Sequence, residues 1–367
     1  MHVPLLRLAF GTEEREALGR VLDSGMLVQG ATVQRFEENL ARVTGRREAV
    51  CVSSGTAALE LALRALGVGP GDEVLCPNLT WPSPANAIAL LGAIPVLVDV
   101  DPVEWNAGPE AFAAARTKRT RAAIAIDQFG FPARIAEIAE ALPGIPLIED
   151  AACAIGSTRH GKPCGSETVV ACFSFHPRKV VTTGEGGCCV TNDPDIAAAL
   201  RELRNHGQRA PGDFARSSGN HRLGELGAAL GLHQLAHLDT FLVARREQAA
   251  QYREELPGLI WQGAAPGSIP NYQTVGALLP EGTKPERRDQ FVFQLNQRGV
   301  GAGPLSFALH RLAPFEASRK AAKRDGRTFR VSKSIVQRGF SLPCFPGLTE
   351  VEMAHVIETV RRLLAHG

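Results

Sequence analysis

The sequence lacks a large excess of charge of either sign and any long, uninterrupted apolar run. Its 40 basic and 38 acidic residues give a formal net charge of +2 at pH 7, which is too balanced to indicate a nucleic-acid-binding protein. No apolar stretch approaches the roughly 18 residues of a transmembrane helix. The opening segment MHVPLLRLAF does not resemble a secretory signal. We therefore expect a cytoplasmic protein that binds neither nucleic acid nor membranes.

The motifs of several common cofactor and metal sites are also missing. No glycine-rich dinucleotide motif follows a candidate strand, and no P-loop, Cys-x-x-Cys or His-Glu-x-x-His motif occurs. His233 and His237 are four residues apart on an expected helix, but no third ligand is evident, so we expect no metal site. Several of the eight cysteines lie in apolar runs, where a reduced cysteine packs like a small hydrophobic residue.

The pattern of apolar residues predicts an α/β fold. Between residues 49 and 191, short apolar runs bounded by turn residues alternate with helical patterns, which is typical of a mostly parallel sheet with helices on both faces. This alternation stops near residue 192, and a long amphipathic helical pattern covers residues 223–255. We predict a large α/β domain over residues 1–240 and a smaller C-terminal α+β domain over residues 241–367.

A turn rich in serine and glycine follows the first predicted strand. The segment SSGTAAL, residues 53–59, opens a helix, and the free N–H groups and dipole of a helix start attract anions. Gly55 allows close approach of the backbone, and Thr56 can add its hydroxyl. A simple helix cap is the alternative interpretation of this segment.

Three further side chains stand at or just after predicted strand ends, where ligands of open α/β sheets collect. Asp150 ends the run PLIED, and a buried carboxylate there needs a protonated ring nitrogen, an arginine or the following backbone N–H groups as its partner. Ser174 can add a hydroxyl to the anion site. Trp81 can stack on a flat ring, or it can be an ordinary packing residue.

Lys179 lies between the apolar run FSF and the turn TGEGG. A lysine at such a junction is most often a solvated surface residue. A partly desolvated lysine that faces a carbonyl can instead form a Schiff base. With Asp150 and the anion site, Lys179 describes a ligand that carries an aldehyde, a basic ring nitrogen and a phosphate. These are the features of pyridoxal 5'-phosphate.

The motifs SSGTAAL, PNLTW, IEDAACAIG, FSFHPRK…TGEGG and NHRLGELGAALGLHQL together resemble the DegT/StrS family of sugar aminotransferases. The likeness runs from about residue 5 to the segment LPCFPGLTE near the C-terminus. It implies the aspartate-aminotransferase fold, which is PLP-dependent transferase fold type I, and a homodimer with shared active sites. By position, Lys179 resembles the Schiff-base lysine of the family and Asp150 the partner of the pyridinium nitrogen.

The resemblance also implies the other residues of the site. It places a phosphate contact from the neighbouring subunit at Asn220 and a substrate contact at His310. The remaining cofactor contacts that it implies are Gly55, Thr56, Ala57, Trp81, Cys153 and Ser174.

Three positions bear on how closely the chain follows the family pattern. Cys153 stands where a glutamine usually contacts the ring oxygen of the cofactor, and a thiol is a weak hydrogen-bonding group. His221 stands where a tyrosine is common, and we include it among the substrate-binding residues. Some relatives have histidine at the lysine position and act as dehydratases, whereas this chain retains Lys179.

The predicted function is ping-pong transamination from L-glutamate or glutamine to a nucleotide-linked keto-sugar, with Lys179 as Schiff-base lysine and proton shuttle. The alternatives are an aminotransferase for a cyclitol or another non-nucleotide ketone, a PLP-dependent sugar dehydratase, and a cofactor-binding protein without catalysis. A basic cluster is either a solvated helix face or a docking surface for an anionic substrate. This basic cluster consists of Arg319, Lys320, Lys323, Arg324, Arg327, Arg330 and Lys333.

Overall fold

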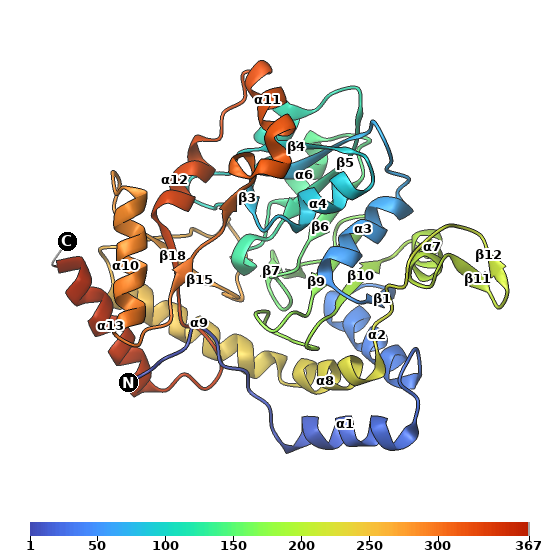
Figure 1. Ribbon diagram of the computed structural model, residues 1–367, viewed down its shortest axis with the longest axis horizontal. Coiled ribbons are helices and arrows are strands. Elements are labelled where there is room, and N and C mark those ends of the chain that lie inside the picture. Colours follow the sequence, from blue (N-terminus) through green and yellow to red (C-terminus); the bar gives the residue numbers. More distant parts are fainter. Residues whose placement is uncertain (366–367) are drawn as a thin grey trace.

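A seven-stranded mixed sheet forms the centre of the computed structural model, which describes residues 1–365 (Figure 1). The strand order is β1-β10-β9-β6-β5-β2-β4. These strands are β1 (Glu48–Val52), β2 (Glu73–Pro77), β4 (Ile94–Val98), β5 (Thr120–Ile126), β6 (Leu147–Asp150), β9 (Val170–Ser174) and β10 (Gly187–Thr191). Only β10 runs antiparallel to its neighbours, and all the other pairings are parallel. The predicted mostly parallel α/β sheet is therefore confirmed.

Helices cover both faces of this sheet because the strand residues are apolar on both sides. One face packs against α3 (Gly55–Ala65), α4 (Ser83–Leu90) and α7 (Pro194–Arg204). The opposite face packs against α2 (Ala31–Thr44) and α8 (Glu225–Ala236) near β1, β9 and β10, and against α5 (Pro109–Ala115) and α6 (Ile135–Ala141) near β2, β4 and β5. Since successive strand residues point to opposite faces, Ile148 and Asp150 lie on the α3 side, whereas Glu149 lies on the other.

The C-terminal part of the chain forms a second, smaller sheet in which every pairing is antiparallel. Its order is β13-β15-β18-β16. The elements of this unit are β13 (Ile260–Trp261), β15 (Val275–Leu278), β16 (Gly303–Pro304), β18 (Gly339–Leu342), α10 (Pro285–Gln297) and α13 (Glu350–Ala365). The N-terminal segment joins this unit through a bridge from Val3 to Val300, and the N-terminus lies near α13 in Figure 1.

The predicted long helix over residues 223–255 is two consecutive helices, α8 and α9 (Leu238–Glu255), which meet at His237. Leu242 near the start of α9 belongs to the core of the large sheet, whereas Ala249 and Tyr252 belong to the core of the small sheet. This helix therefore connects the two units. The boundary at residue 240 stays a prediction, and residues 366 and 367 of the predicted small domain lie outside the described residues.

Short elements complete the structure. A hairpin of β11 and β12 projects from the body (Figure 1), and β3 pairs with β17 across the two units. The remaining elements are α1 (Thr12–Ser24), β3 (Leu79–Thr80), β7 (Thr158–Arg159), β8 (Lys162–Pro163), β11 (Gln208–Ala210), β12 (Asp213–Phe214), β14 (Ser268–Ile269), β17 (Phe307–Ala308), α11 (Glu316–Arg324), α12 (Arg330–Arg338) and the 3-10 turns Gln128–Gly130, Leu309–Arg311 and Ala313–Phe315. Among the helices of residues 1–365, none combines the length and the apolar character needed to cross a membrane.

Candidate active site

Lys179, Asp150 and Cys153 come together at the carboxyl edge of the large sheet. The parallel strands β6 and β9 end there at Asp150 and Ser174, and Lys179 lies in the loop that follows β9. The Nζ atom of Lys179 lies 3.1 Å from the Sγ atom of Cys153. The positive charge of Lys179 is also close enough to lower the pKa of the Asp150 carboxyl. The structure thus brings the predicted Schiff-base lysine and the predicted pyridinium partner into one site.

Asp150 is a buried carboxylate that forms no direct ion pair with another described residue. Its exposed fraction is 5%, and burial raises its pKa from 3.8 to about 6, although the charge of Lys179 and the backbone N–H of Ala152 act in the opposite direction. The Ala152 N–H, at 3.2 Å from Oδ1, is its hydrogen-bond partner. No arginine among residues 1–365 forms an ion pair with Asp150. A cationic ring nitrogen would supply the missing positive partner.

The start of α3 forms a close-fitting anion cradle with the end of β9. Ser54 caps α3, and its side chain accepts a hydrogen bond of 3.1 Å from the Ala57 N–H. A Cβ atom added at Gly55 would lie only 2.7 Å from the Cβ atom of Ser174. Only glycine therefore lets these two segments approach so closely. The Oγ1 atom of Thr56 lies 2.5 Å from the Oγ atom of Ser83, which the sequence analysis did not predict.

These features fit pyridoxal phosphate. Asp150 lies on the same face of the sheet as α3, as its alternation with Ile148 in β6 requires. A helix start with nearby hydroxyls suits a phosphate, a buried carboxylate suits a ring cation, and the amine of Lys179 suits an aldehyde. The donor set therefore has one group for each reactive part of the cofactor.

Trp81 and His310 lie next to the paired strands β3 and β17, which connect the two units. Trp81 follows β3, is 63% exposed, and meets the ring of Phe307 edge-on at a centroid distance of 5.3 Å. His310 follows β17, the partner strand of β3, and its Nδ1 atom lies 2.9 Å from Nδ2 of Asn78. Burial lowers the pKa of His310, and nearby cations lower it further. The His310 ring stacks on Phe329 at a centroid distance of 4.8 Å, and its predicted contact with the substrate stays a prediction.

Asn220 and His221 lie beside the end of β1. A hydrogen bond of 2.8 Å from the Ser53 N–H to the carbonyl of His221 fixes this segment next to the SSGTAAL turn. Asn220 is exposed, and its Oδ1 atom accepts a hydrogen bond of 3.2 Å from the Arg222 N–H. Within residues 1–365 of one chain, no hydrogen bond joins Asn220 to Thr56 or Ser174. A contact of Asn220 with the phosphate of a neighbouring subunit stays a prediction.

A buried acidic cluster lies on the opposite face of the sheet. The side chains of Asp127, Glu149 and Cys164 have potential ligand atoms within 4.8 Å of one another. Burial, together with the charge of Glu149, raises the pKa of Asp127 well above its usual range. Glu149 accepts a hydrogen bond of 2.7 Å from the Gly165 N–H and lies near the cation Arg46. Burial raises the pKa of both acids, and two adjacent buried carboxylates repel each other when both are charged, so the pair favours one shared proton.

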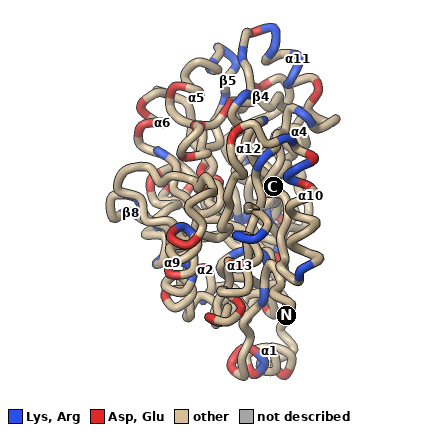
Figure 2. The backbone as a smooth tube through the Cα atoms, turned by 90° about the vertical axis from the view of Figure 1, so that its left-hand side faces the viewer, with Lys and Arg blue, Asp and Glu red and all other residues tan. Residues whose placement is uncertain are grey.

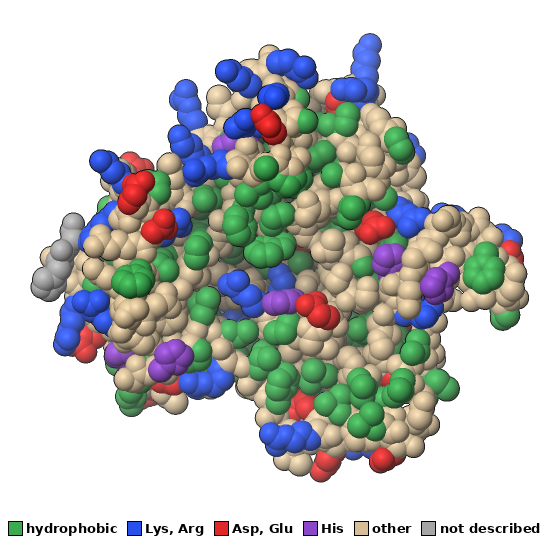
Figure 3. Space-filling view, in the orientation of Figure 1, with side chains coloured by type: hydrophobic (Ala, Val, Ile, Leu, Met, Phe, Trp, Pro, Cys, Tyr) green, Lys and Arg blue, Asp and Glu red, His purple; other side chains and the backbone are tan. Residues whose placement is uncertain are grey.

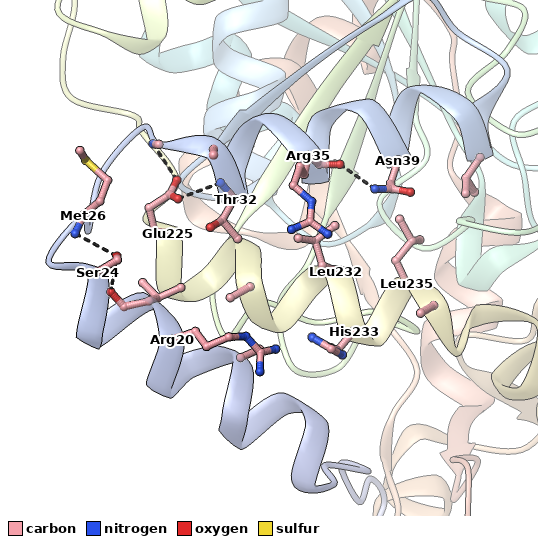
Figure 4. A pocket seen from close by; sticks show the side chains of 17 residues that line it. Arg20, Ser24, Met26, Thr32, Arg35, Asn39, Glu225, Leu232, His233 and Leu235 are labelled. Carbon is pink, nitrogen blue, oxygen red and sulfur yellow. Dashed lines mark hydrogen bonds between the residues drawn. The ribbon is translucent and has the colours of Figure 1, made fainter.

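A cavity of about 870 Å³ lies away from these residues, between α1, α2 and α8 (Figure 4). Its buried acid, Glu225, accepts hydrogen bonds from the backbone N–H groups of Gly30, Thr32 and Val33 at the start of α2. Because these bonds already satisfy the Glu225 carboxylate, Glu225 holds the start of α2 in place and is not a free acid for catalysis. The site at the sheet edge remains the better candidate.

The chain is similar in sequence and in fold to several solved aminotransferases. The chain matches the aminotransferase TlmJ from Streptoalloteichus hindustanus with 30% identity, a TM-score of 0.90 and 99% coverage of both chains. It matches DesV from S. venezuelae with 33% identity and a TM-score of 0.88, over 96% of this chain and 94% of the other. An aminotransferase from Brucella abortus matches with 31% identity and a TM-score of 0.86, over 95% of each chain.

A model of the DegT/DnrJ/EryC1/StrS aminotransferase family matches residues 9–361. The match confirms the predicted fold type I and aminotransferase class, and it confirms pyridoxal phosphate as the cofactor on which the family depends. This chain belongs to the DegT/DnrJ/EryC1/StrS aminotransferase family.

Proposed function

We propose that the protein transfers an amino group from L-glutamate or glutamine to a nucleotide-linked keto-sugar. One observation supports this proposal most strongly. Lys179 and the buried Asp150 lie in one site at the carboxyl edge of the large sheet, on the side of the sheet that α3 covers. The chain retains lysine at the position where dehydratases of the family have histidine. This favours transamination over dehydration of the sugar.

In this proposal, different residues bind each reactive part of the cofactor. Lys179 binds the aldehyde through Nζ, and Asp150 keeps the ring nitrogen protonated. Trp81 stacks on the ring, and Cys153 takes the place of the usual glutamine at its edge. The phosphate is held by Gly55, Thr56, Ala57, Ser174 and, from the neighbouring subunit, Asn220.

Lys179 also moves the proton during the reaction. Bound pyridoxal phosphate supplies an electron sink that stabilises negative charge on the carbon next to the transferred amino group. The amine of Lys179 would act as the general base that takes the proton from the donor carbon. The same Nζ atom returns a proton in the second half of the cycle, when the keto-sugar accepts the amino group. His310 and His221 would contact this substrate.

The basic cluster supports a substrate that carries phosphates. Lys and Arg residues gather around α11 at one end of the molecule (Figure 2), and their side chains are exposed on the face that Figure 3 shows. The charges of Arg319 and Lys333 reach His310, since both lower its pKa. Arg327 has a structural role instead, because its NH1 donates a hydrogen bond of 2.6 Å to the carbonyl of Leu97. A positive field next to the proposed substrate entrance favours a nucleotide diphosphate over a neutral cyclitol.

A cytoplasmic homodimer completes the proposal, with a role in amino-sugar and natural-product biosynthesis. The last turn of α1 and the connection from α1 to α2 expose the apolar side chains Leu22, Met26, Leu27 and Val28. Exposed apolar residues that cluster in this way are typical of an interface. A second subunit would also give Asn220 its predicted partner, the cofactor phosphate.

The test is to follow the nitrogen. The PLP-loaded enzyme is incubated with ¹⁵N-labelled glutamate or glutamine and a panel of nucleotide-linked keto-sugars, free keto-sugars and keto-cyclitols, and the products are analysed by mass spectrometry. We expect ¹⁵N in a nucleotide-linked sugar. Label in cyclitols alone would contradict the substrate assignment, and loss of water from a sugar without consumption of the amino donor would contradict transamination.

A further inference from the structure

We propose that Asn271 and Gln273 are positioning residues that hold the segments of Cys153 and Lys179 against each other. Both residues lie in the connection between β14 and β15, far along the chain from the site that they contact. The inference rests on the proposed function, because it assigns these residues to the geometry around Lys179.

Asn271 holds the turn that carries Cys153. Its side chain is fully buried, and its Nδ2 atom donates hydrogen bonds of 2.9 Å to the carbonyl of Cys153 and 2.8 Å to the carbonyl of Ile155. Its backbone N–H donates a hydrogen bond of 2.9 Å to the Oγ atom of Ser157. The turn that follows β6 has no sheet partner for these carbonyls, so their hydrogen bonds must come from outside.

Gln273 holds the segment that carries Lys179. Its Nε2 atom donates a hydrogen bond of 2.6 Å to the carbonyl of Arg178, the residue before Lys179. Its Oε1 atom accepts a hydrogen bond of 3.0 Å from Thr274. Gln273 thus binds the backbone next to Lys179, and Asn271 binds the backbone of Cys153. The 3.1 Å separation of Lys179 Nζ and Cys153 Sγ therefore depends on both amides.

The segment between these amides has an unusual backbone conformation and is held by further hydrogen bonds. Tyr272 has a φ of 52°, a left-handed conformation that is unusual for a residue other than glycine and persists only where the surroundings impose it. The buried Arg245 donates hydrogen bonds to the carbonyls of Tyr272 at 3.4 Å and Gln273 at 3.3 Å. The Oδ1 atom of Asn271 accepts a further bond of 2.8 Å from the Gln273 N–H.

The residues around the Asn271 side chain also pack closely against it. A Cβ atom added at Gly130 would lie 1.8 Å from its Oδ1 atom, and the φ of 90° at Gly130 is one that side-chain-bearing residues rarely adopt. The Ser157 hydroxyl, which accepts from Asn271, donates a bond of 2.8 Å to the carbonyl of Gly130. The side chain of Asn271 is therefore restricted to one position, as expected of a residue that sets the position of its neighbours.

The test compares Asn271→Ala and Gln273→Ala with two matched controls. Asn106→Ala and Gln262→Ala also remove buried amides that donate to carbonyls, namely those of Phe131 at 2.9 Å and Glu104 at 2.7 Å. Neither control residue contacts Cys153 or Arg178. Gln273 is only half-buried, so its variant keeps the test decisive where Asn271→Ala does not fold.

Two readouts are independent of turnover. In the cofactor-free protein, we expect iodoacetamide to alkylate Cys153 faster in both test variants than in the controls, as peptide mass spectrometry measures. In the PLP-loaded protein, we expect the pH midpoint of the absorbance of the lysine-bound cofactor to move. In steady state, kcat should fall roughly 10- to 100-fold with little change in KM, as for a small misplacement of a catalytic group.

The outcomes separate this inference from the proposed function. Wild-type alkylation rate, absorbance midpoint and kcat in folded Gln273→Ala would overturn the positioning role, and equal changes in the control variants would also overturn it. If wild-type protein forms no covalent link between PLP and Lys179, the proposed function fails instead.

Discussion

Asp150→Asn is predicted to stabilise the cofactor-free protein at alkaline pH, although it removes a residue of the active site. Burial raises the pKa of Asp150 from 3.8 to about 6, and at about 1.4 kcal/mol per pKa unit this corresponds to roughly 3 kcal/mol. Because the folded-state pKa is the higher one, the penalty is complete above pH 6 and disappears below about pH 4. The neutral asparagine avoids it.

We therefore expect Asp150→Asn to raise the free energy of unfolding of the cofactor-free protein by up to about 3 kcal/mol at pH 8. The gain should shrink as the pH falls through 6. With cofactor present the order should reverse, because asparagine cannot pair with a cationic ring nitrogen. Removing one partner of a buried ion pair costs roughly 3–5 kcal/mol, so the affinity for PLP should fall at least about 100-fold.

The assay is urea unfolding at pH 5 and pH 8, with and without PLP, of the wild type, Asp150→Asn and the control Asp23→Asn. Asp23 is an exposed acid near the end of α1, so its variant should follow the wild type. Two results would refute the reasoning: a loss of stability in cofactor-free Asp150→Asn at pH 8, or equal stabilisation of the wild type and Asp150→Asn by PLP.

The remaining predictions concern the cradle, the ring stacker and the acidic pair. Gly55→Ala should weaken PLP binding in an absorbance titration, because its Cβ atom would lie 2.7 Å from the Cβ atom of Ser174; unchanged affinity would argue against the cradle. Trp81→Leu should weaken PLP binding about fivefold, since ring stacking contributes roughly 1 kcal/mol; wild-type affinity in dialysis would exclude stacking. Asp127→Asn should stay within about 1 kcal/mol of the wild type in urea unfolding at pH 7, because an amide can replace a protonated acid as the donor to Glu149. Glu149→Gln should cost more, because it removes the charge that Arg46 faces, and the reverse order would place the shared proton on Glu149.

Much of the large sheet could be predicted because short stretches of the sequence are enough to identify its strands and helices. Runs such as AVCV and IPVLV are apolar on both faces, and the turns between them are rich in glycine and proline, so strands and helices could be located from periodicity. The reversed direction of β10 could not, because a buried strand has the same pattern in either orientation. The break between α8 and α9 also left no signal, since the helical pattern continues through His237.

The candidate site was predictable where its residues follow strands. Asp150, Ser174 and the SSGTAAL turn each come at or just after a strand, and parallel strands bring their ends to one edge. Asn271 and Gln273 were missed because their contacts with Cys153 and Arg178 span 118 and 95 residues. No local pattern marks an amide whose partner is a backbone carbonyl so distant in the sequence.

The most direct test of the account is to find the lysine that PLP modifies. The protein is incubated with PLP, the covalent link is reduced with borohydride, and the digested peptides are analysed by mass spectrometry. We expect the added mass on Lys179 and on no other lysine, and no added mass at this position in Lys179→Ala. Modification of another lysine in the wild type, with Lys179 unlabelled, would contradict the account.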